Sequence, residues 1–519
     1  MDGGELNCEC EAENMPEVSI STQKGPILED RRKEIALFFV KQGLLASSEA
    51  IDAIAENEVE LEQIAKTAKK REMFIISREF VEEFSTDDTK PAQEFHFVVR
   101  KGSNARASKI ESELTIDDSL DITGNSTSEG KIENFVSLFS DRYKRLSKIL
   151  SERVNLKDTV QIGDLESTAR TDVKIIGMIR EMRRSKNGKL MLELEDMTGS
   201  VMAVFIGEEP PGGFTLTNDE VVGITGTLQR NRGMIIFAKE IIEPDIPVTK
   251  PRQVVEDDIS IAFISDIHVG SFLFKDREFR KFISWLNMGG PEKSRELASG
   301  VKYLFIAGDA VDGIGIYPSQ EKELSIPDIY KQYDYLAKLL TNIPSYIEVV
   351  MIPGNHDAVR RVEPQPSLKD LLSPLCDLPN FHLIGSPGRV KAHGIDVQLY
   401  HGTSMDGLIS TIPGLSYDKP EIAQKEYLKK RHYAPIYGTK DQIAPEERDY
   451  MVMEDVPDIM HCGHVHKNGY SNYRGVTIIN SGTWQAQTDF QAQQGHIPTP
   501  CQVPILELKN WNLKVINFE

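Results

Sequence analysis

Five short segments in the second half of the chain carry residue types that hold metal ions: SDIHVG, AGDAVDG, PGNHDA, LYHGTS and HCGHVH. Mixed carboxylate, amide and imidazole ligands suit Mn, Fe, Zn or Mg, whereas Ca prefers oxygen ligands alone. Asp309 can bridge two cations, because a carboxylate has two oxygens. The segments therefore predict a site for a pair of divalent cations. The candidate residues are Asp266, His268, Asp309, Asn355, His356, His401, His464 and His466.

The expected chemistry is hydrolysis of an anionic ester. Two divalent cations carry more positive charge than the carboxylates of Asp266 and Asp309 neutralise, so the site attracts an anion such as a phosphodiester. Two such ions can activate water as the nucleophile and stabilise the leaving oxygen. Gly308, Gly354 and Gly463 fit this interpretation, since glycine lets the backbone turn sharply and approach a ligand closely.

Each segment follows a run of apolar, β-prone residues, which predicts strands that end at the candidate site. The runs are ISIAFI, KYLFIA, IEVVMI, VQLY and a shorter one that ends at Met460. Such runs are typical of strands buried on both faces, with helices as the covering layers. Polar groups collect at strand ends in these sheets, so the side chains can converge on one rim. Helical spacing recurs between the runs, at Phe279, Phe282, Ile283 and Leu286, and at Tyr330, Tyr333, Leu336, Ala337 and Leu340.

In this order, the motifs DxH, GDxxD, GNHD, HG and GHxH resemble the signature of the calcineurin-like metallophosphoesterases. The resemblance implies an α/β domain in which a β-sandwich is flanked by helices. His356 matches the family histidine that is not a ligand and that stabilises the transition state or protonates the leaving oxygen. Asp312 stands where some nucleases of the family carry a second histidine, so its role stays open. The implied ligands are Asp266, His268, Asp309 and His466 for one metal, and Asp309, Asn355, His401 and His464 for the other.

Other interpretations of the same segments are weaker. HCGHVH as a Cys/His zinc knot would need a second ligand pair at finger spacing, which the sequence lacks. HGTSMDG lacks the final glycine of a nucleophile elbow, so Ser404 is not expected to be a hydrolase nucleophile. No GxxxxGK[ST] occurs, so an NTP-binding P-loop is not expected. A lone histidine or aspartate is more often structural than functional, but five ordered segments favour a functional site.

Composition limits what the rest of the chain can be. A length of 519 residues exceeds what one hydrophobic core usually organises, which predicts several domains. Five cysteines, of which Cys376, Cys462 and Cys501 are scattered, argue against a disulfide framework and for a reducing, cytoplasmic location. The sequence has no long apolar run and no basic, apolar N-terminus, so neither a membrane span nor a secretory signal is expected. A net charge of −20 implies that contact with nucleic acid is local or that a partner supplies positive charge.

Changes in composition and periodicity predict a multidomain chain. The expected segments are a disordered acidic tail (1–26), a small helical domain (27–85), a mostly disordered linker (86–132), a connecting helix (133–155), an OB-fold (156–248) and the phosphoesterase domain (249–519). The linker is predicted from its abundance of Ser, Thr, Asp, Asn, Gly and Lys, apart from a strand-like patch from Phe95 to Val99. The connecting helix FVSLFSDRYKRLSKIL has an apolar stripe that is expected to pack against the next domain.

The helical domain is expected to contain two helices. Glu29 and Asp30 open the first, and Gly43 ends it. Ser47 or Ser48 caps the second, whose apolar residues continue at helical spacing to Ala68. A packing module and a partner-docking module fit this pattern equally well.

The pattern then changes to short strands with turn signals, including Asn187-Gly188, the strongest short hairpin signal. LELEDMTGSVMAVF resembles a common segment of OB-folds, which are small, partly open β-barrels. Interleaved aromatics for base stacking are absent, so a structural or docking role is favoured. The densest basic cluster either contacts a nucleic-acid backbone or is a solvated hairpin, and it consists of Arg180, Arg183, Arg184, Lys186 and Lys189.

The order of these parts resembles the small subunits of archaeal family D DNA polymerases and, more distantly, the B-subunits of eukaryotic replicative polymerases. The likeness includes the connecting helix and the late stretch SGTWQAQTDFQAQQGHIPTPCQVPILEL. Eukaryotic B-subunits have typically lost metal ligands, whereas this chain retains each of them.

The resemblance implies a proofreading 3′-to-5′ exonuclease that uses two divalent cations, Mn²⁺ first among Mn²⁺, Mg²⁺, Fe²⁺ and Zn²⁺. Asp309 orients the attacking hydroxide, His356 assists departure of the 3′ oxygen, and a nucleoside 5′-monophosphate is released. The implied partners are a large catalytic polymerase subunit and single-stranded 3′ ends of DNA, with no membrane. Two alternatives stay open: a mainly non-catalytic scaffold subunit, and a free-standing metallophosphoesterase.

Overall fold

A computed structural model describes residues 25–42, 44–56, 61–70, 75–76, 80–81, 105–205, 215–231, 233–248, 250–438 and 442–519. The chain forms two compact units, Met1–His96 and Phe97–Glu519. Within the described residues, no helix is both long enough and apolar enough to cross a membrane. Residues 1–24 of the predicted tail and 86–104 of the predicted linker, with the patch from Phe95 to Val99, lie outside the described residues.

The first unit is built from helices that bury one face each. Its first helix begins at Gly25, before the predicted start at Glu29, and the predicted second helix is two helices. Ser47 caps the second helix, because its Oγ accepts the backbone N–H of Ala50 at 3.1 Å. The core includes the buried side chains of Phe39 and Ile64. The elements are α1 (Gly25–Lys41), β1 (Leu45–Ala46), α2 (Ser48–Glu56), α3 (Leu61–Lys70) and β2 (Ile75–Ile76).

The prediction of a mostly disordered linker is wrong from residue 105 onward. A strand there, β3 (Leu114–Ile116), pairs antiparallel with β13 (Gly388–Ala392) at the edge of a sheet. The backbone N–H groups of Thr127 and Ser128 donate to the buried Glu446 carboxylate at 2.6 and 3.0 Å. The polar residues that suggested disorder therefore bond to the phosphoesterase body. Two short 3-10 helices complete the segment, η1 (Arg106–Lys109) and η2 (Asp118–Leu120).

The predicted connecting helix is α5 (Ile132–Ser151), and it packs within the chain as expected. Leu138 contributes to a cluster of the phosphoesterase body, while Leu146 and Leu150 pack with Ile176 and Met178 of the barrel that follows. The helix thus packs against both of the domains that follow it in sequence. It is followed by η3 (Val154–Leu156) and η4 (Ile162–Leu165).

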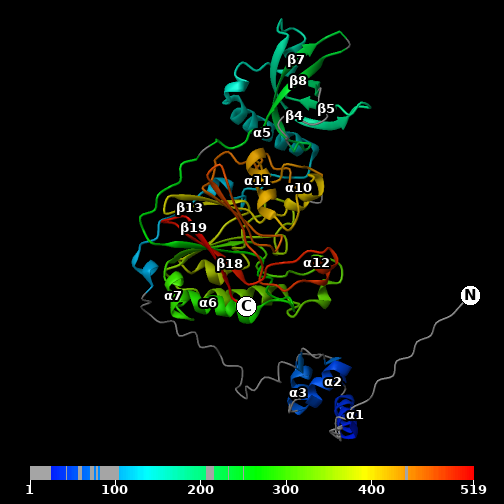
Figure 1. Cartoon of the computed structure of the whole chain (residues 1–519), viewed down its shortest axis with the longest axis vertical. Coiled ribbons are helices and arrows are strands. Elements are labelled where there is room, and N and C mark those ends of the chain that lie inside the picture. The colour runs from blue at the N-terminus through cyan, green and yellow to red at the C-terminus, as the bar shows by residue number, and fades with distance from the viewer. Residues whose placement is uncertain are drawn as a thin grey trace, which may run out of the picture. The chain divides into compact units, whose positions relative to one another are not determined.

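The predicted OB-fold is a five-stranded barrel, and it is closed rather than partly open (Figure 1). It closes because β6 and β8 pair in parallel, with Met202 opposite Ile235. Gly188, with a φ of 76°, forms the predicted turn between the first two strands. The barrel interior is filled by apolar side chains such as Ile175, Leu192 and Ile236. Its strands are β4 (Asp172–Arg184), β5 (Leu190–Glu195), β6 (Ser200–Phe205), β7 (Val221–Gln229) and β8 (Ile235–Ile242).

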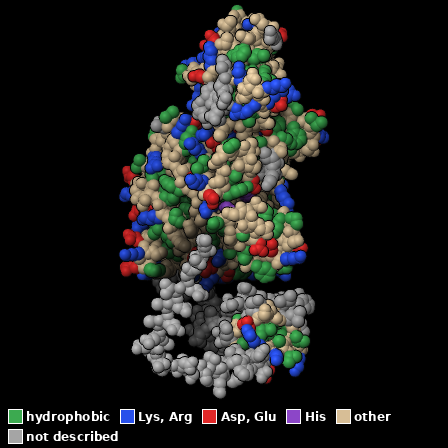
Figure 2. All heavy atoms as spheres, turned by 45° about the vertical axis from the view of Figure 1, so that its right-hand side comes forward, with side chains coloured by type: hydrophobic (Ala, Val, Ile, Leu, Met, Phe, Trp, Pro, Cys, Tyr) green, Lys and Arg blue, Asp and Glu red, His purple; other side chains and the backbone are tan. Residues whose placement is uncertain are grey.

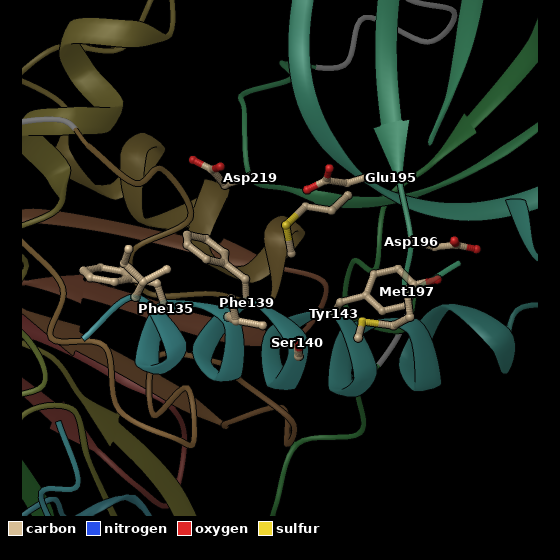
Figure 3. A pocket seen from close by; sticks show the side chains of 11 residues that line it. Phe135, Phe139, Ser140, Tyr143, Glu195, Asp196, Met197 and Asp219 are labelled. Carbon is tan, nitrogen blue, oxygen red and sulfur yellow. The ribbon is translucent and has the colours of Figure 1, made fainter. Parts of the chain in front are cut away.

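A groove of about 380 Å³ lies between α5 and the barrel. Figure 3 shows Phe135, Phe139 and Tyr143 along the helix, with Asp219 and Glu195 above them. Ile132 and Val136, which also line it, are exposed by 79% and 62%. The helix therefore has a second apolar stripe beside the one that it buries. The charged residues among the described lining are acidic: Glu195, Asp196 and Asp219.

The phosphoesterase body is a sandwich of two six-stranded sheets with helices outside, as the resemblance implied (Figure 1). The orders are β12-β11-β10-β9-β18-β19 and β16-β17-β15-β14-β13-β3. The strands that lead to the predicted motifs are wholly buried, except for Glu348 at the start of β11, which explains their continuous apolar runs. The strands are β9 (Ser260–Ile264), β10 (Val301–Ala307), β11 (Glu348–Ile352), β12 (Phe381–Leu383), β14 (Ile395–Leu399), β15 (Ile459–Cys462), β16 (Gly469–Tyr473), β17 (Val476–Asn480), β18 (Gln502–Glu507) and β19 (Asn512–Asn517).

The helices of the body bury the apolar faces that their spacing predicts. Phe279, Phe282 and Ile283 of α6 and Leu336 of α8 belong to the cluster outside the first sheet, whereas Tyr330 is exposed. A second cluster lies between the sheets, and a third outside the second sheet. The helices are α6 (Asp276–Leu286), α7 (Glu292–Ala298), η5 (Gln320–Lys322), α8 (Ile329–Leu340), α9 (Ser373–Cys376), α10 (Met405–Thr411), α11 (Pro420–Lys430) and α12 (Asp489–Gln493).

A buried ion pair fixes α5 to the body. Arg142 is fully buried, and its Nε donates to Asp449 Oδ2 at 2.7 Å. Asp449 Oδ2 also lies 2.9 Å from Nε2 of the buried His432. Arg142 Nη1 donates to the carbonyl of Pro435 at 3.2 Å. Because the charges are removed from water, each depends on the other for compensation.

Replacing Arg142 by Met is expected to lower the free energy of unfolding of the body by about 3–5 kcal/mol, because Asp449 would lose its compensating cation. Trp285, Trp484 and Trp511 all lie in the body, so denaturation followed by tryptophan fluorescence measures this quantity. Lys144→Met, which removes an exposed charge from the same helix, is the control. Equal stability of the two variants would contradict the prediction.

The stability of this region is expected to fall as the pH drops from about 6.5 to 4. Burial and the charge of Arg142 lower the pKa of His432 from 6.5 to about 4, although Asp449 opposes them. The unfolded chain therefore binds a proton that the folded chain refuses in this window, which favours unfolding as the pH falls. Asp449 stays charged there, because Arg142 and His432 overcome burial and hold its pKa well below its usual range.

Between pH 7 and pH 5, the wild-type protein should lose about 2 kcal/mol more unfolding free energy than His432→Gln. The same fluorescence measurement at several pH values checks this difference. Parallel pH curves for the two proteins would show that His432 is not responsible.

Candidate metal centre

The predicted ligands lie at the carboxyl ends of parallel strands. β9, β10 and β11 are parallel neighbours in one sheet, and β14 and β15 are parallel in the other. Parallel strands end at the same edge of a sheet, so the loops that follow them meet there. The residues that follow these strands are Asp266 and His268 (β9), Asp309 (β10), Asn355 and His356 (β11), His401 (β14), and His464 and His466 (β15).

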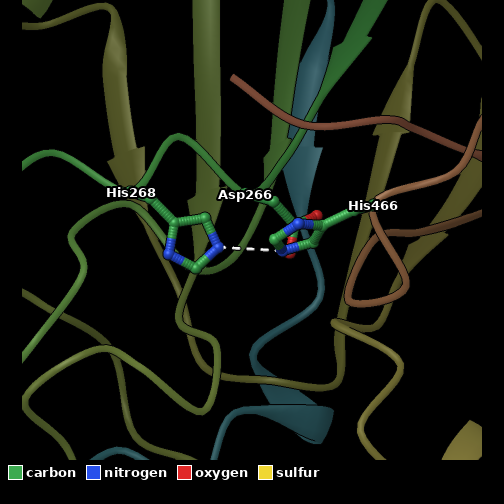
Figure 4. A group of neighbouring side chains, drawn as sticks. All are labelled: Asp266, His268 and His466. Carbon is green, nitrogen blue, oxygen red and sulfur yellow. Dashed lines mark hydrogen bonds and ion pairs between the residues drawn. The ribbon is translucent and has the colours of Figure 1, made fainter. Parts of the chain in front are cut away.

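One half of the centre consists of Asp266, His268 and His466, all buried (Figure 4). His268 Nε2 lies 2.9 Å from His466 Nε2, the contact drawn as a dashed line in Figure 4. His466 Nε2 lies 3.5 Å from Asp266 Oδ1. Asp309 Oδ2 is 3.9 Å from His268 Nε2, so Asp309 adjoins this half.

The other half consists of Asp309, Asn355, His401 and His464. Asn355 Oδ1 lies 3.0 Å from His401 Nε2 and 3.0 Å from His464 Nδ1. His401 Nε2 lies 3.3 Å from Asp309 Oδ2. Asp309 therefore stands between the two halves.

The donor set fits divalent cations, because imidazole nitrogens and carboxylate and amide oxygens face one another at short distances. His401 Nδ1 donates to the carbonyl of Ala307 at 2.7 Å, so a ring that gives up its other proton to a cation would present its Nε2 lone pair on the side of Asp309 and Asn355. His268 Nδ1 lies 3.1 Å from Asp312 Oδ1, so its Nε2 would likewise present a lone pair. A cation satisfies such groups, as outer carboxylate and carbonyl partners of metal-binding histidines do elsewhere.

The pKa shifts of the candidate ligands show how their charges affect one another. Burial lowers the pKa of His401, but the carboxylates of Asp309 and Asp266 overcome it and raise this pKa to about 10. Burial raises the pKa of Asp309, but His401 and His356 overcome it and hold this pKa well below its usual range. Burial dominates at Asp266, whose pKa is raised. A positive charge is therefore favoured beside Asp309.

Five of the candidate residues have left-handed backbone conformations. Their φ values are 51° for Asp266, 55° for His268, 51° for Asp309, 71° for His464 and 55° for His466. Non-glycine residues rarely adopt positive φ, and such residues cluster at functional sites. Sharp turns directly after each strand aim these side chains at one another.

The three glycines singled out in the sequence allow close approach, as expected. A Cβ atom at Gly308, whose φ is 84°, would lie 2.5 Å from His401 Nδ1. At Gly463 it would lie 2.5 Å from Asp266 Oδ2, and at Gly354 it would overlap Asp309 Oδ1. Any side chain at these positions would displace a candidate ligand.

His356 is held beside the centre by two contacts. Its backbone N–H donates to Asp309 Oδ1 at 2.8 Å, and its Nδ1 lies 2.8 Å from the carbonyl of Asp312. Because the second contact engages Nδ1, the other ring nitrogen, Nε2, is available for a substrate. The ring is 4.7 Å from that of His268, edge to face. Its position suits contact with a reacting group beside the ligands.

Asp312, whose role the sequence left open, supports His268. Its Oδ1 lies 3.1 Å from His268 Nδ1 and accepts from Gln485 Nε2 at 3.0 Å, while its Oδ2 accepts from Gln320 Nε2 at 2.9 Å. The carboxylate fixes the tautomer and orientation of the ring. Its place within GDxxD was the available signal.

The sequence did not single out Gln491 or Asp406. Gln491 Nε2 lies 2.8 Å from His466 Nδ1, and Asp406 Oδ1 lies 3.5 Å from His464 Nε2. Neither residue shares a motif with the ligand it contacts. Contacts between segments this far apart in the chain leave no spacing signal.

The basic cluster predicted to contact DNA is separate from the ligands, on the β4–β5 hairpin of the barrel. Arg180 and Arg183 are exposed, and Arg180 Nη1 pairs with Glu193 at 3.3 Å. On the face shown in Figure 2, basic and acidic side chains are interspersed. Nucleic-acid contact through Arg180, Arg183, Arg184, Lys186 and Lys189 stays a prediction.

The surroundings of Ser404 do not suit a nucleophile, in line with the sequence analysis. It is buried, and its Oγ contacts Tyr427 Oη at 2.8 Å and the carbonyl of Tyr433. The hydroxyl is therefore occupied in the protein interior.

Two family models match the chain. A calcineurin-like phosphoesterase model matches residues 259–468, and an OB-fold nucleic acid binding domain model matches residues 173–246. Both domain types predicted from the sequence are thereby confirmed.

Several archaeal proteins are similar over most of the chain. The DNA polymerase II small subunit of Archaeoglobus fulgidus is 42% identical, over 83% of this chain and 86% of that protein. That of Methanothermobacter thermautotrophicus is 38% identical, over 91% of this chain and 97% of that protein. That of Methanocaldococcus jannaschii is 39% identical, over 81% and 72% respectively.

Asp312→Asn is expected to weaken Mn²⁺ binding by about 10- to 100-fold. The amide nitrogen would face one of the donors that now converge on the carboxylate, and His268 would lose its charged partner. Titration calorimetry with Mn²⁺ measures the affinity. Asp334→Asn, on the exposed side of α8, changes the charge equally and should bind Mn²⁺ as the wild type does. Unchanged affinity in Asp312→Asn would contradict the role assigned to Asp312.

Proposed function

This chain belongs to the family of archaeal DNA polymerase II small subunits, and from that membership we propose that it is a metal-dependent 3′-to-5′ exonuclease acting in proofreading. The observation that carries the proposal is the complete ligand set, in which all predicted ligands converge around Asp309. A subunit that served only as a scaffold would not need to bury these charges, since doing so costs free energy.

Each residue of the centre has a proposed role. Asp266, His268 and His466 would hold one cation, Asn355, His401 and His464 would hold a second, and Asp309 would contribute to both sites. Cations bound there would lower the pKa of water and neutralise charge on the phosphoryl oxygens. The metals follow from the donor set, with Mn²⁺ first, and Mg²⁺, Fe²⁺ or Zn²⁺ as alternatives.

The substrate is the terminal phosphodiester of a single-stranded 3′ end. Water attacks the phosphorus in line, and the bond to the 3′ oxygen of the preceding nucleotide breaks, which releases a nucleoside 5′-monophosphate. The Asp309 carboxylate lies where it can orient the attacking water. In its doubly protonated form, His356 would donate the Nε2 proton to the departing 3′ oxygen while Nδ1–H stays bonded to the Asp312 carbonyl, and the ring would take up a proton again after each turnover.

The proposed partner is the large catalytic subunit of the polymerase. The name small subunit, which these relatives share, implies a larger assembly, and the net charge of −20 favours a partner that supplies positive charge near DNA. The exposed Ile132 and Val136 of the α5 groove favour a protein partner as well, because apolar patches rimmed by polar residues mark interaction sites.

The test offers 3′-labelled single-stranded DNA and Mn²⁺ to the purified chain, alone and with the large subunit. The wild type should release mononucleotides, and His356→Ala should lower kcat by about 10²–10⁴-fold while binding Mn²⁺ normally. His382→Ala, at a half-buried histidine paired with Glu348 at the sheet edge, should retain activity. The proposal fails if the wild type releases no mononucleotides in either state, or if His356→Ala matches it.

A further inference from the structure

His461, the first histidine of HCGHVH, has no place among the ligands. It lies in β15, is fully buried, and places its Nε2 2.9 Å from Ser481 Oγ. Its Nδ1 has no hydrogen-bond partner in the part of the chain that the structure describes. Burial lowers the pKa of His461 to about 3, so the ring is neutral. A neutral, buried imidazole with one contact calls for an explanation.

A chain of hydroxyl groups leads from His461 to a candidate ligand. Ser481 Oγ lies 2.7 Å from Ser265 Oγ, and Ser265 Oγ in turn donates to Asp266 Oδ2. The three groups come from different parts of the sequence, since Ser481 follows β17 and Ser265 follows β9. All are buried, so water does not compete for these hydrogen bonds.

The tautomer of His461 sets the direction of the whole chain. An unpaired buried N–H at Nδ1 would lose its hydrogen bond to water, so the proton resides on Nε2, where Ser481 accepts it. Ser481 then has its own hydrogen to donate to Ser265, and Ser265 has its own to donate to Asp266. With the opposite tautomer, Ser481 would donate to His461, and Ser265 could turn toward Ser481 and leave Asp266.

Competing acceptors show why the direction matters. Ser265 Oγ also lies 3.1 Å from the carbonyl of Gly482, and Ser481 Oγ lies 3.2 Å from the carbonyl of Cys462. Each serine has one hydrogen and two acceptors within reach. The donor at His461 favours the arrangement in which both hydrogens point toward Asp266.

We propose that His461 is a positioning residue for Asp266, acting through Ser481 and Ser265. The hydrogen bond to Oδ2 holds the carboxylate so that Oδ1, which lies 3.5 Å from His466 Nε2, would be turned toward a bound cation. This inference rests on the proposed metal site but concerns its assembly. It gives the first histidine of HCGHVH a role in orienting a metal ligand that it does not contact directly.

The test measures Mn²⁺ affinity without nucleic acid, by titration calorimetry and by the electron paramagnetic resonance of free Mn²⁺. His461→Phe removes the donor and fills the space beside Phe263, whose ring is 5.0 Å from that of His461. Ser481→Ala interrupts the chain with less change in volume. Each should weaken Mn²⁺ binding by about 10- to 100-fold. His461→Gln, which can place an amide donor near Ser481, should restore much of the affinity.

The double variant His461→Phe/Ser481→Ala should bind Mn²⁺ no more weakly than either single variant, because both break one chain. Cys462→Ala is the packing control. This neighbour in β15 packs in the cluster outside the second sheet, and its side chain is not one of the groups that link His461 to Asp266. It should lower the melting temperature without changing Mn²⁺ affinity.

Wild-type affinity in Ser481→Ala would overturn the inference, and so would equal weakening in His461→Phe and His461→Gln. If His461→Phe does not fold, Ser481→Ala and His461→Gln decide the matter. The wild type could bind Mn²⁺ with an affinity that these variants weaken, yet release no mononucleotides. That result would refute the exonuclease and leave the inference intact.

Discussion

The metal centre depends on one electrostatic constraint: a buried carboxylate, that of Asp309, requires positive charge beside it, and several imidazole and oxygen ligands surround it. Bringing buried carboxylates and imidazoles together in this way is unfavourable unless a cation compensates them. The surrounding structure opposes their separation. Buried parallel strands fix the loops, positive φ values aim the side chains, and glycines remove the atoms that would keep them apart. The rigid sandwich therefore holds the ligands in place before a cation binds, which favours cation binding.

Much of this centre could be predicted from the sequence, because its ligands occur in short motifs after buried strands. Continuous apolar runs identified β9, β10 and β11, and motif order identified the family. The supporting groups could not be predicted in the same way. Gln485 and Gln491 reach the centre through tertiary contacts, and a glutamine in a polar segment carries no periodicity. The prediction of a disordered linker was wrong for a related reason. Thr127 and Ser128 are typical linker residues, and their bonds to Glu446 form only in the folded protein.

Buried charges also specify how the barrel meets the body. Besides the pair formed by Arg142, Lys430 of α11 lies 2.8 Å from Glu220 at the start of β7, with both side chains almost fully buried. An apolar interface can slide at small cost, whereas a buried ion pair is compensated in one geometry only. The barrel is therefore held in one orientation by contacts that tolerate little displacement.

The edge strand β3 changes how the chain should be divided. It belongs to the second sheet of the sandwich, whereas β9, where the chain returns from the barrel, belongs to the first. The barrel and α5 are thus an insertion within one discontinuous domain, anchored at one end to each sheet. A force or a ligand that displaced the barrel would pull on both halves of the sandwich, and the metal centre lies where the loops of these two halves meet.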